Sequence, residues 1–122
     1  MLPTSNVVLV IDDDEGLQES LEALLELEGY QARAAHDGIQ ALEALREIKP
    51  ALILLDVMMP RMNGYELVAE MRRRQYLPGI PIILLTADGR PKEKATHLGV
   101  DGYVGKPFEI DAFLMQIHRF LP

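Results

Sequence analysis

Short apolar runs alternate with amphipathic stretches five times along the chain. The apolar runs predict β-strands over 6–11, 31–35, 51–55, 80–85 and 101–104. The runs 51–55 and 80–85 are nearly all apolar, which is typical of strands that are buried on both faces of a parallel sheet. We therefore expect a parallel sheet with helices packed on both of its faces.

The stretches between the strands carry apolar residues at helical spacing. The first helix is expected to end at Gly29, the second to begin near Asp37, and the third to begin around Asn63-Gly64. Pro91 fits the first turn of the fourth helix, which should end at Leu98-Gly99. The apolar stripes expected to face the core are Leu17, Leu21, Leu24 and Leu25; Ile39, Leu42, Leu45 and Ile48; Leu67, Val68 and Met71; and Ile110, Phe113, Leu114 and Ile117.

Strands that alternate with crossover helices predict a (βα)5 fold. Because such crossovers are right-handed, the predicted architecture is a doubly wound, three-layer α/β sandwich around a five-stranded parallel sheet. The chain shows no internal repeat, linker or low-complexity segment. We expect residues 1–122 to form a single domain.

Composition narrows the class of protein. The chain has no Cys, which excludes disulfides and thiolate metal sites and fits a cytoplasmic location. A net charge of −7 argues against direct binding to nucleic acid. No apolar run approaches the roughly 20 residues that a membrane-spanning helix needs, and the first residues lack the pattern of a signal peptide. We expect a cytoplasmic domain that binds neither nucleic acid nor membrane.

Three aspartates mark the ends of two predicted strands. Asp12 and Asp13 follow the first strand, and Asp56 follows the third. Each of them alone would be an ordinary helix cap or turn residue. At the carboxyl ends of parallel strands, however, they should meet in one crevice. Carboxylates at close quarters repel one another, so either a pKa is raised or a hard cation is bound, Mg²⁺ or alternatively Mn²⁺.

Two further strand ends complete the set. Thr86 and Lys106 lie at the ends of the fourth and fifth strands. With them, residues 6–121 closely resemble the receiver domain of two-component response regulators. The most specific parts are Asp56-Val-Met-Met-Pro-Arg-Met-Asn-Gly64 and Lys106-Pro107-Phe108. The resemblance implies a flavodoxin-like fold with strand order 2-1-3-4-5 and a phosphorylation-dependent signalling switch.

By this resemblance, Asp56 is the phosphoacceptor and takes a phosphoryl group from a phosphohistidine. The donor would be a sensor histidine kinase or a histidine phosphotransfer domain. Asp13, Asp56 and the backbone carbonyl of Met58 would be direct Mg²⁺ ligands, with Asp12 acting through a water. The physics agrees, because a carboxylate is a competent nucleophile toward phosphorus once charge is neutralised.

The other residues of the set would act on the phosphoryl group and its lifetime. Lys106 would pair with a phosphoryl oxygen, and Thr86 with the backbone N–H of Ala87 would hydrogen-bond others. Met58 and Asp88 flank the expected approach of a hydrolytic water. In this family the Lys106–Pro107 peptide bond is typically cis.

The resemblance also implies a switch and a docking surface. Thr86 and Tyr103 would reorganise the face built from the fourth helix, fifth strand and fifth helix, which an output partner reads. Tyr103 is otherwise a half-buried strand aromatic. The kinase would dock on Leu17, Ser20, Pro107 and Phe108, although Leu17 fits a core position equally well. A monomer and a phosphorylation-dependent dimer both remain open, as do a free-standing regulator and a piece of a larger one.

Three other functions compete. A haloacid-dehalogenase-like phosphatase needs an Asp-x-Asp nucleophile on the first strand, whereas the residue two beyond Asp56 is Met58. An FMN-binding module needs phosphate-binding backbone donors, whereas residues 12–15 are all acidic. A degenerate receiver that serves only for docking would not need the complete set. We therefore expect no enzyme beyond the domain's own phosphorylation and dephosphorylation.

Two groups of basic residues have plainer interpretations. His36, His97 and His118 lie on separate elements without metal-binding spacing, so surface positions are expected. Arg72-Arg73-Arg74 is expected to be a solvated helix end.

Overall fold

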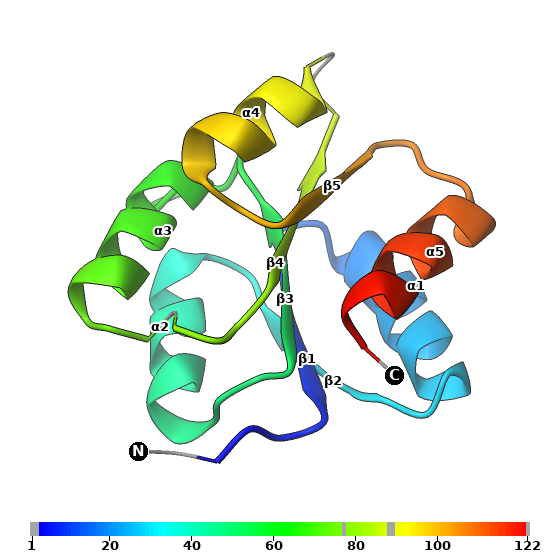
Figure 1. Cartoon of the computed structure of the whole chain (residues 1–122), viewed down its shortest axis with the longest axis horizontal. Coiled ribbons are helices and arrows are strands. Elements are labelled where there is room, and N and C mark those ends of the chain that lie inside the picture. Colours follow the sequence, from blue (N-terminus) through cyan, green and yellow to red (C-terminus); the bar gives the residue numbers. More distant parts are fainter. Residues whose placement is uncertain (1–2, 77, 88–89, 122) are drawn as a thin grey trace.

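The computed structural model describes residues 3–76, 78–87 and 90–121, and within them strands alternate strictly with helices (Figure 1). The elements are β1 (Val7–Ile11), α1 (Glu15–Leu27), β2 (Gln31–Ala35), α2 (Gly38–Glu47), β3 (Leu52–Asp56), α3 (Gly64–Arg73), β4 (Ile82–Thr86), α4 (Pro91–Leu98), β5 (Gly102–Gly105) and α5 (Ile110–Phe120). All four strand pairs are parallel and the order is β2-β1-β3-β4-β5. The predicted fold and strand order are confirmed.

The sheet separates two apolar layers. Helices α2, α3 and α4 cover one face, and α1 and α5 cover the other (Figure 1). Successive residues of β1 point to opposite faces, so that Leu9 and Ile11 join one core while Val8 and Val10 join the other. Both central strands, β3 and β4, are buried along their whole length, as their continuous apolar runs predict. None of the described helices is long and apolar enough to cross a membrane.

The strand register brings the chemistry to one edge of the sheet. Ile11 of β1 pairs with Leu55 of β3, so the next residues, Asp12 and Asp56, stand level with each other. On β4 and β5, Thr86 pairs with Gly105, which places Lys106 just beyond the same edge. The carboxyl ends of four strands therefore converge, as expected for a parallel sheet.

Local signals set the helix boundaries. Asp14, Asp37 and Asn63 cap α1, α2 and α3, each accepting a hydrogen bond from a backbone N–H in the first turn. These caps satisfy donors that the helices leave unpaired, and those at Asp37 and Asn63 confirm the predicted starts of α2 and α3. Gly99 ends α4 with a φ of 71°, a left-handed conformation that glycine adopts without strain.

Some sequence expectations were wrong in detail. Ile39 and Ile110, predicted to face the core, are 42% and 55% exposed. Ile39 lies off the buried stripe of α2, which runs through Gly38, Ala41, Leu42 and Leu45, and Ile110 is the first residue of α5, ahead of its first buried residue, Phe113. Strand β4 begins at Ile82 rather than residue 80, since Pro81 has no N–H for the ladder. Strand β3 includes Asp56 as its last residue.

Candidate functional site

Asp12, Asp13 and Asp56 form an acid cluster at the carboxyl edge of the sheet. One oxygen from each carboxylate lies within 4.8 Å of the others. Asp12 and Asp56 are buried, while Asp13 is exposed, so the cluster opens to solvent on one side. Oxygen ligands at this spacing suit a hard divalent cation. The sequence prediction that these three residues meet is confirmed.

Lys106 reaches into the acid cluster from the end of β5. Its ammonium lies 2.6 Å from Oδ2 of Asp12 and 3.5 Å from Oδ2 of Asp56. Its backbone N–H donates to the carbonyl of Thr86 at 2.7 Å, and the Lys106–Pro107 peptide bond is cis, as the family resemblance implied. When all four groups are ionised, the three carboxylates and one ammonium sum to a charge of −2, which a divalent cation would balance.

The electrostatics of the cluster follow from burial and charge. Burial raises the pKa of the Asp56 carboxyl, and the charge of Asp12 raises it further, against the opposing effect of Lys106. Burial alone would lower the pKa of Lys106, but the hydrogen bond and charge of Asp12 outweigh it, and the net shift is upward. A bound cation would favour the ionised form of Asp56, because a nearby positive charge stabilises a carboxylate that burial otherwise destabilises.

Backbone donors orient two of the carboxylates. The N–H of Met58 donates to Oδ1 of Asp56 at 3.1 Å, and the N–H of Asp14 donates to Oδ1 of Asp12 at 2.9 Å. Asp12 therefore has one oxygen bonded to a backbone N–H and the other to Lys106. Asp56 has its Oδ1 bonded to a backbone N–H, while its Oδ2 lies 3.5 Å from the Lys106 ammonium.

Gln18 is a buried residue that the sequence analysis did not single out. Its side-chain amide donates to the carbonyls of Asp12 at 2.7 Å and of Ala35 at 2.8 Å, which joins α1 to the ends of β1 and β2. The Ala35 carbonyl also accepts from the backbone N–H of Asp12 at 3.1 Å, so the amide adds buried hydrogen bonds to the strand ends. The available signal was a polar residue on the same helical face as Leu21 and Leu25.

Thr86 and Tyr103 occupy different environments. Thr86 is buried at the end of β4, in the strand beside the one that carries Asp56. Tyr103, paired with Leu84 in the sheet, is 37% exposed. The structure therefore places Thr86 at the carboxyl edge and leaves the Tyr103 ring partly in solvent.

The four predicted docking residues line one apolar hollow, which we call the α1–α5 hollow. It has a volume of about 710 Å³ and lies beside Lys106. Leu17 is partly buried against the core, so both of its predicted roles fit its position. The rings of Phe108 and Phe113 stack with centroids 5.2 Å apart, which anchors the hollow to the core. The residues concerned are Leu17, Ser20, Pro107 and Phe108, together with Leu24 and Leu27 farther along α1 and Ile110 at the start of α5.

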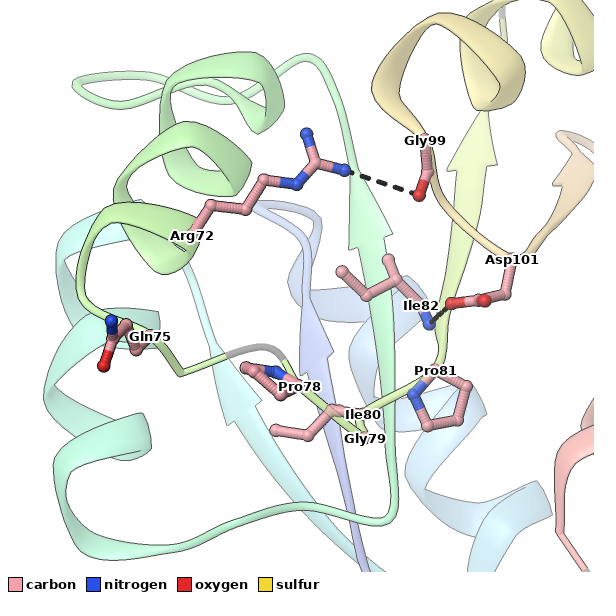
Figure 2. A pocket seen from close by; sticks show the side chains of 9 residues that line it. All are labelled: Arg72, Gln75, Pro78, Gly79, Ile80, Pro81, Ile82, Gly99 and Asp101. Carbon is pink, nitrogen blue, oxygen red and sulfur yellow. Dashed lines mark hydrogen bonds between the residues drawn. The ribbon is translucent and has the colours of Figure 1, made fainter.

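A second hollow lies at the opposite edge of the sheet, where β4 begins (Figure 2). Arg72 borders it and donates to the carbonyls of Leu98 and Gly99 at 2.5 and 3.4 Å. Asp101 accepts from the N–H of Ile82 at 2.9 Å. These polar groups join α3, α4 and β4. Arg72 is exposed in the last turn of α3, as expected of a solvated helix end, and its guanidinium also caps the end of α4.

The histidines take no part in the acid cluster. His97 and His118 are exposed and His36 is partly buried, and His118 pairs with Glu28 at 2.8 Å. Arg73 and Arg74 both bind Glu70, whose pKa they lower to about 2, as expected of an exposed helix end. Asp88, which was predicted to flank the hydrolytic water, lies outside the described residues.

Comparison with known proteins gives one consistent result. Residues 8–118 match the family model of the response regulator receiver domain. Response regulator MprA of Mycobacterium ulcerans is 38% identical over 116 residues, which cover 93% of this chain and 49% of that protein. MprA of Mycobacterium tuberculosis H37Rv is 37% identical with nearly the same coverage, 93% and 50%. The chain thus spans about half the length of these curated relatives.

Solved structures agree with the sequence relatives. Chemotaxis protein CheY4 of Vibrio cholerae superposes with a TM-score of 0.85 at 31% identity, covering 94% of this chain and 98% of that one. Response regulator TrrA of Thermotoga maritima, solved in complex with Mg²⁺ and BeF, superposes with a TM-score of 0.83 at 31% identity, covering 96% and 100%.

Proposed function

Because this chain belongs to the response regulator receiver domain family of two-component signalling, we propose that Asp56 is the residue that accepts the phosphoryl group. The supporting observation is the position of Asp56 at the end of β3, inside the acid cluster and 3.5 Å from the Lys106 ammonium. The donor is a phosphohistidine of a sensor histidine kinase or of a histidine phosphotransfer domain.

The acid cluster fits Mg²⁺, or alternatively Mn²⁺. Asp13, Asp56 and the backbone carbonyl of Met58 would hold the ion directly. Asp12 would act through a water, since both of its oxygens already accept hydrogen bonds. When bound, the ion neutralises charge on the attacking carboxylate and on the incoming phosphoryl oxygens. The related TrrA was solved with Mg²⁺ and BeF, which supports this assignment.

Of the chain's own residues, Asp56 alone would form a covalent bond in the transfer. Oδ2 of Asp56 attacks phosphorus, an O–P bond forms, and the P–N bond of the donor breaks as the imidazole leaves with the electron pair. Lys106 shifts from Asp12 toward a phosphoryl oxygen, and the Thr86 hydroxyl and the Ala87 N–H bind others. Positioned opposite charges and donors stabilise the transferred group.

Phosphorylation is read at a distance from Asp56. Thr86 moves toward the phosphoryl group and Tyr103, now 37% exposed, turns inward to fill the space, which changes the α4–β5–α5 face for an output partner. The kinase or phosphotransfer domain docks on the α1–α5 hollow through Leu17, Ser20, Pro107 and Phe108. We place the function in the cytoplasm, in one receiver domain over 1–122, as a monomer or a phosphorylation-dependent dimer without direct nucleic-acid or membrane binding.

Chemical phosphorylation tests the proposal. Acetyl phosphate with Mg²⁺ should add one phosphoryl group, and EDTA should block the reaction. Asp56→Asn should abolish it, because an amide is not a competent nucleophile here. Asp111→Asn, an exposed carboxylate in the first turn of α5, is the matched control and should react normally. A phosphoryl group found on Thr86 or on a histidine would refute the assignment.

A further inference from the structure

The loop between β3 and α3, residues 57–63, contains a strained turn near the acid cluster. The N–H of Met62 donates to the carbonyl of Pro60 at 2.7 Å, which closes a three-residue turn with Arg61 at its centre. Arg61 has a φ of 66°. The left-handed region is unfavourable for a residue with a Cβ, and a three-residue turn of this hand is rare. Such a backbone persists only where surrounding contacts hold it.

Two contacts with the start of α2 hold this turn. The guanidinium of Arg61 pairs with the carboxylate of Asp37, whose side chain is only 4% exposed. The same carboxylate caps α2 by accepting from the N–H of Gln40 at 2.9 Å. Next to it, Met62 packs on Gly38 so closely that a Cβ there would lie 2.7 Å from the Met62 side chain. The turn is thus attached to α2 at two successive positions.

The other end of the loop is also fixed. The N–H of Gly64 donates to the carbonyl of Val57 at 2.9 Å, and a Cβ on Gly64 would lie 2.8 Å from the Cα of Val57. Met58 lies between these two attachments. Its own side chain is 70% exposed, so packing of that side chain does not hold its backbone in place. The Met58 N–H donates to Asp56 and the next residue, Met59, is buried in the core, so the attachments on either side act together with these contacts to position the Met58 carbonyl.

We propose that the Arg61–Asp37 ion pair is a positioning device for the cation site. By offsetting the strain at Arg61, the pair holds the loop in the shape that presents the Met58 carbonyl beside Asp56. The role proposed for Arg61 and Asp37 requires no contact with the cation or the phosphoryl group. The proposal rests on the proposed function, in which Met58 supplies a ligand. Ligands that are fixed before binding lose less freedom on binding, so the pair should increase cation affinity.

Electrostatics alone predicts that removing the Arg61 side chain changes the cation affinity in the opposite direction. Removing a positive charge near a cation site should tighten cation binding, whereas loosening the loop should weaken it. We therefore expect Arg61→Ala to raise the Mg²⁺ dissociation constant by about threefold to tenfold, at or below the low end of effects known for outer contacts of metal sites. The measurement is a Mg²⁺ titration of the whole chain, followed by backbone amide shifts. Arg46→Ala, an exposed arginine in the last turn of α2, makes the same charge change as a control.

Two more variants separate positioning from general loss of structure. Arg61→Gly removes the guanidinium but adopts a positive φ without strain, so it should recover part of the affinity that Arg61→Ala loses. Asp37→Asn keeps an oxygen to cap α2 while removing the ion pair. Combining Asp37→Asn with Arg61→Ala should weaken Mg²⁺ binding by less than the product of the two single effects, since both remove one interaction. In metal-free protein, hydrogen exchange at Met62 should be faster in Arg61→Ala than in the parent.

The outcomes are distinguishable. If the parent binds Mg²⁺ at Asp13 and Asp56 and Arg61→Ala binds it equally or more tightly, the positioning role is refuted and the proposed function stands. If the parent shows no Mg²⁺-dependent shifts at these aspartates, the proposed function is refuted and the positioning role with it. Weaker binding in Arg61→Ala with unchanged binding in Arg46→Ala supports the role.

Discussion

Lys106 and Asp12 form a close ion pair, with the ammonium 2.6 Å from a carboxylate oxygen. Asp12 is fully buried and Lys106 is only 19% exposed at its side chain. The lysine is therefore the principal compensating charge for the acid cluster before any cation binds. It also lies close enough to Asp56, at 3.5 Å, to reach a phosphoryl group there with a small shift.

Replacing this lysine should separate stability from metal binding. Lys106→Met leaves a buried carboxylate without its ion-pair partner, which we expect to lower the free energy of unfolding by about 1–3 kcal/mol in metal-free protein. Mg²⁺ should restore most of the loss, because the ion supplies the missing charge. Urea unfolding with and without Mg²⁺ measures both effects. Lys92→Met, at an exposed position of α4, is the control and should unfold like the parent. An unfolding free energy of Lys106→Met equal to that of the parent would contradict the prediction.

The raised pKa of Asp56 predicts a pH-dependent cost to stability. Its ordinary value is 3.8, and burial together with the charge of Asp12 raises it in the folded protein. The folded state therefore holds this proton more tightly than the unfolded state. The stability that the protonated Asp56 carboxyl contributes is complete below pH 3.8 and is lost as the pH rises through the folded-state pKa.

Asp56→Asn removes this cost, so the variant should be more stable than the parent near neutral pH without Mg²⁺. A gain of about 1 kcal/mol would raise the Tm by roughly 4 °C in a domain of this size. The advantage should shrink as the pH falls through the folded-state pKa of Asp56 and should be absent below pH 3.8, where the parent is protonated in both states. Thermal unfolding of the variant and the parent in EDTA, near neutral pH and again below pH 3.8, checks this. A variant no more stable than the parent at neutral pH would show that the cluster is not under strain from its charges.

The sequence predicted the acid cluster well because strand ends are readable from apolar runs, and parallel topology then brings those ends together. Asp12, Asp56 and Thr86 could be placed for this reason. Gln18 and Arg61 could not, because their partners are backbone carbonyls and a carboxylate on other elements of the fold. Polar contacts of this kind leave no periodic pattern, so they depend on packing that only the folded structure shows.

Thr86 should separate phosphorylation from its effect on the output face. Thr86→Ala keeps the nucleophile and the metal ligands, so acetyl phosphate should still modify Asp56. Without the hydroxyl, the phosphorylated packing gains less stabilisation, and the amide shifts that beryllofluoride induces in α4, β5 and α5 should fall by about half or more. Thr96→Ala, which removes a hydroxyl that bonds the Lys92 carbonyl within α4, is the control. Shifts equal to those of the parent would contradict the switch role of Thr86.

Leu17 should distinguish protein donors from small ones. If the α1–α5 hollow receives the kinase, Leu17→Ala should slow transfer from a cognate kinase by about tenfold, the cost of one interface residue of about 1.4 kcal/mol. Acetyl phosphate needs no docking, so its reaction should be unaffected. Met115→Ala, an exposed apolar residue of α5 that does not line the hollow, is the control. Equal slowing with both donors would favour the core role of Leu17.

Met58 should affect the lifetime of the phosphorylated state. Hydrolysis requires a water in line with phosphorus, and the Met58 N–H bonds Asp56 itself, so its side chain lies beside the expected approach. The side chain is 70% exposed and is a thioether, which orients water poorly. An amide at this position offers both a donor and an acceptor. We therefore expect a lifetime of minutes or longer for the parent and a severalfold shorter one for Met58→Asn, equivalent to about 1 kcal/mol in the barrier.

Decay of the phosphorylated protein after removal of acetyl phosphate measures this lifetime, with Met58→Leu as the apolar control. Because Met58→Leu keeps the size and lacks the amide, equal acceleration in both variants would attribute the effect to lost packing rather than to oriented water.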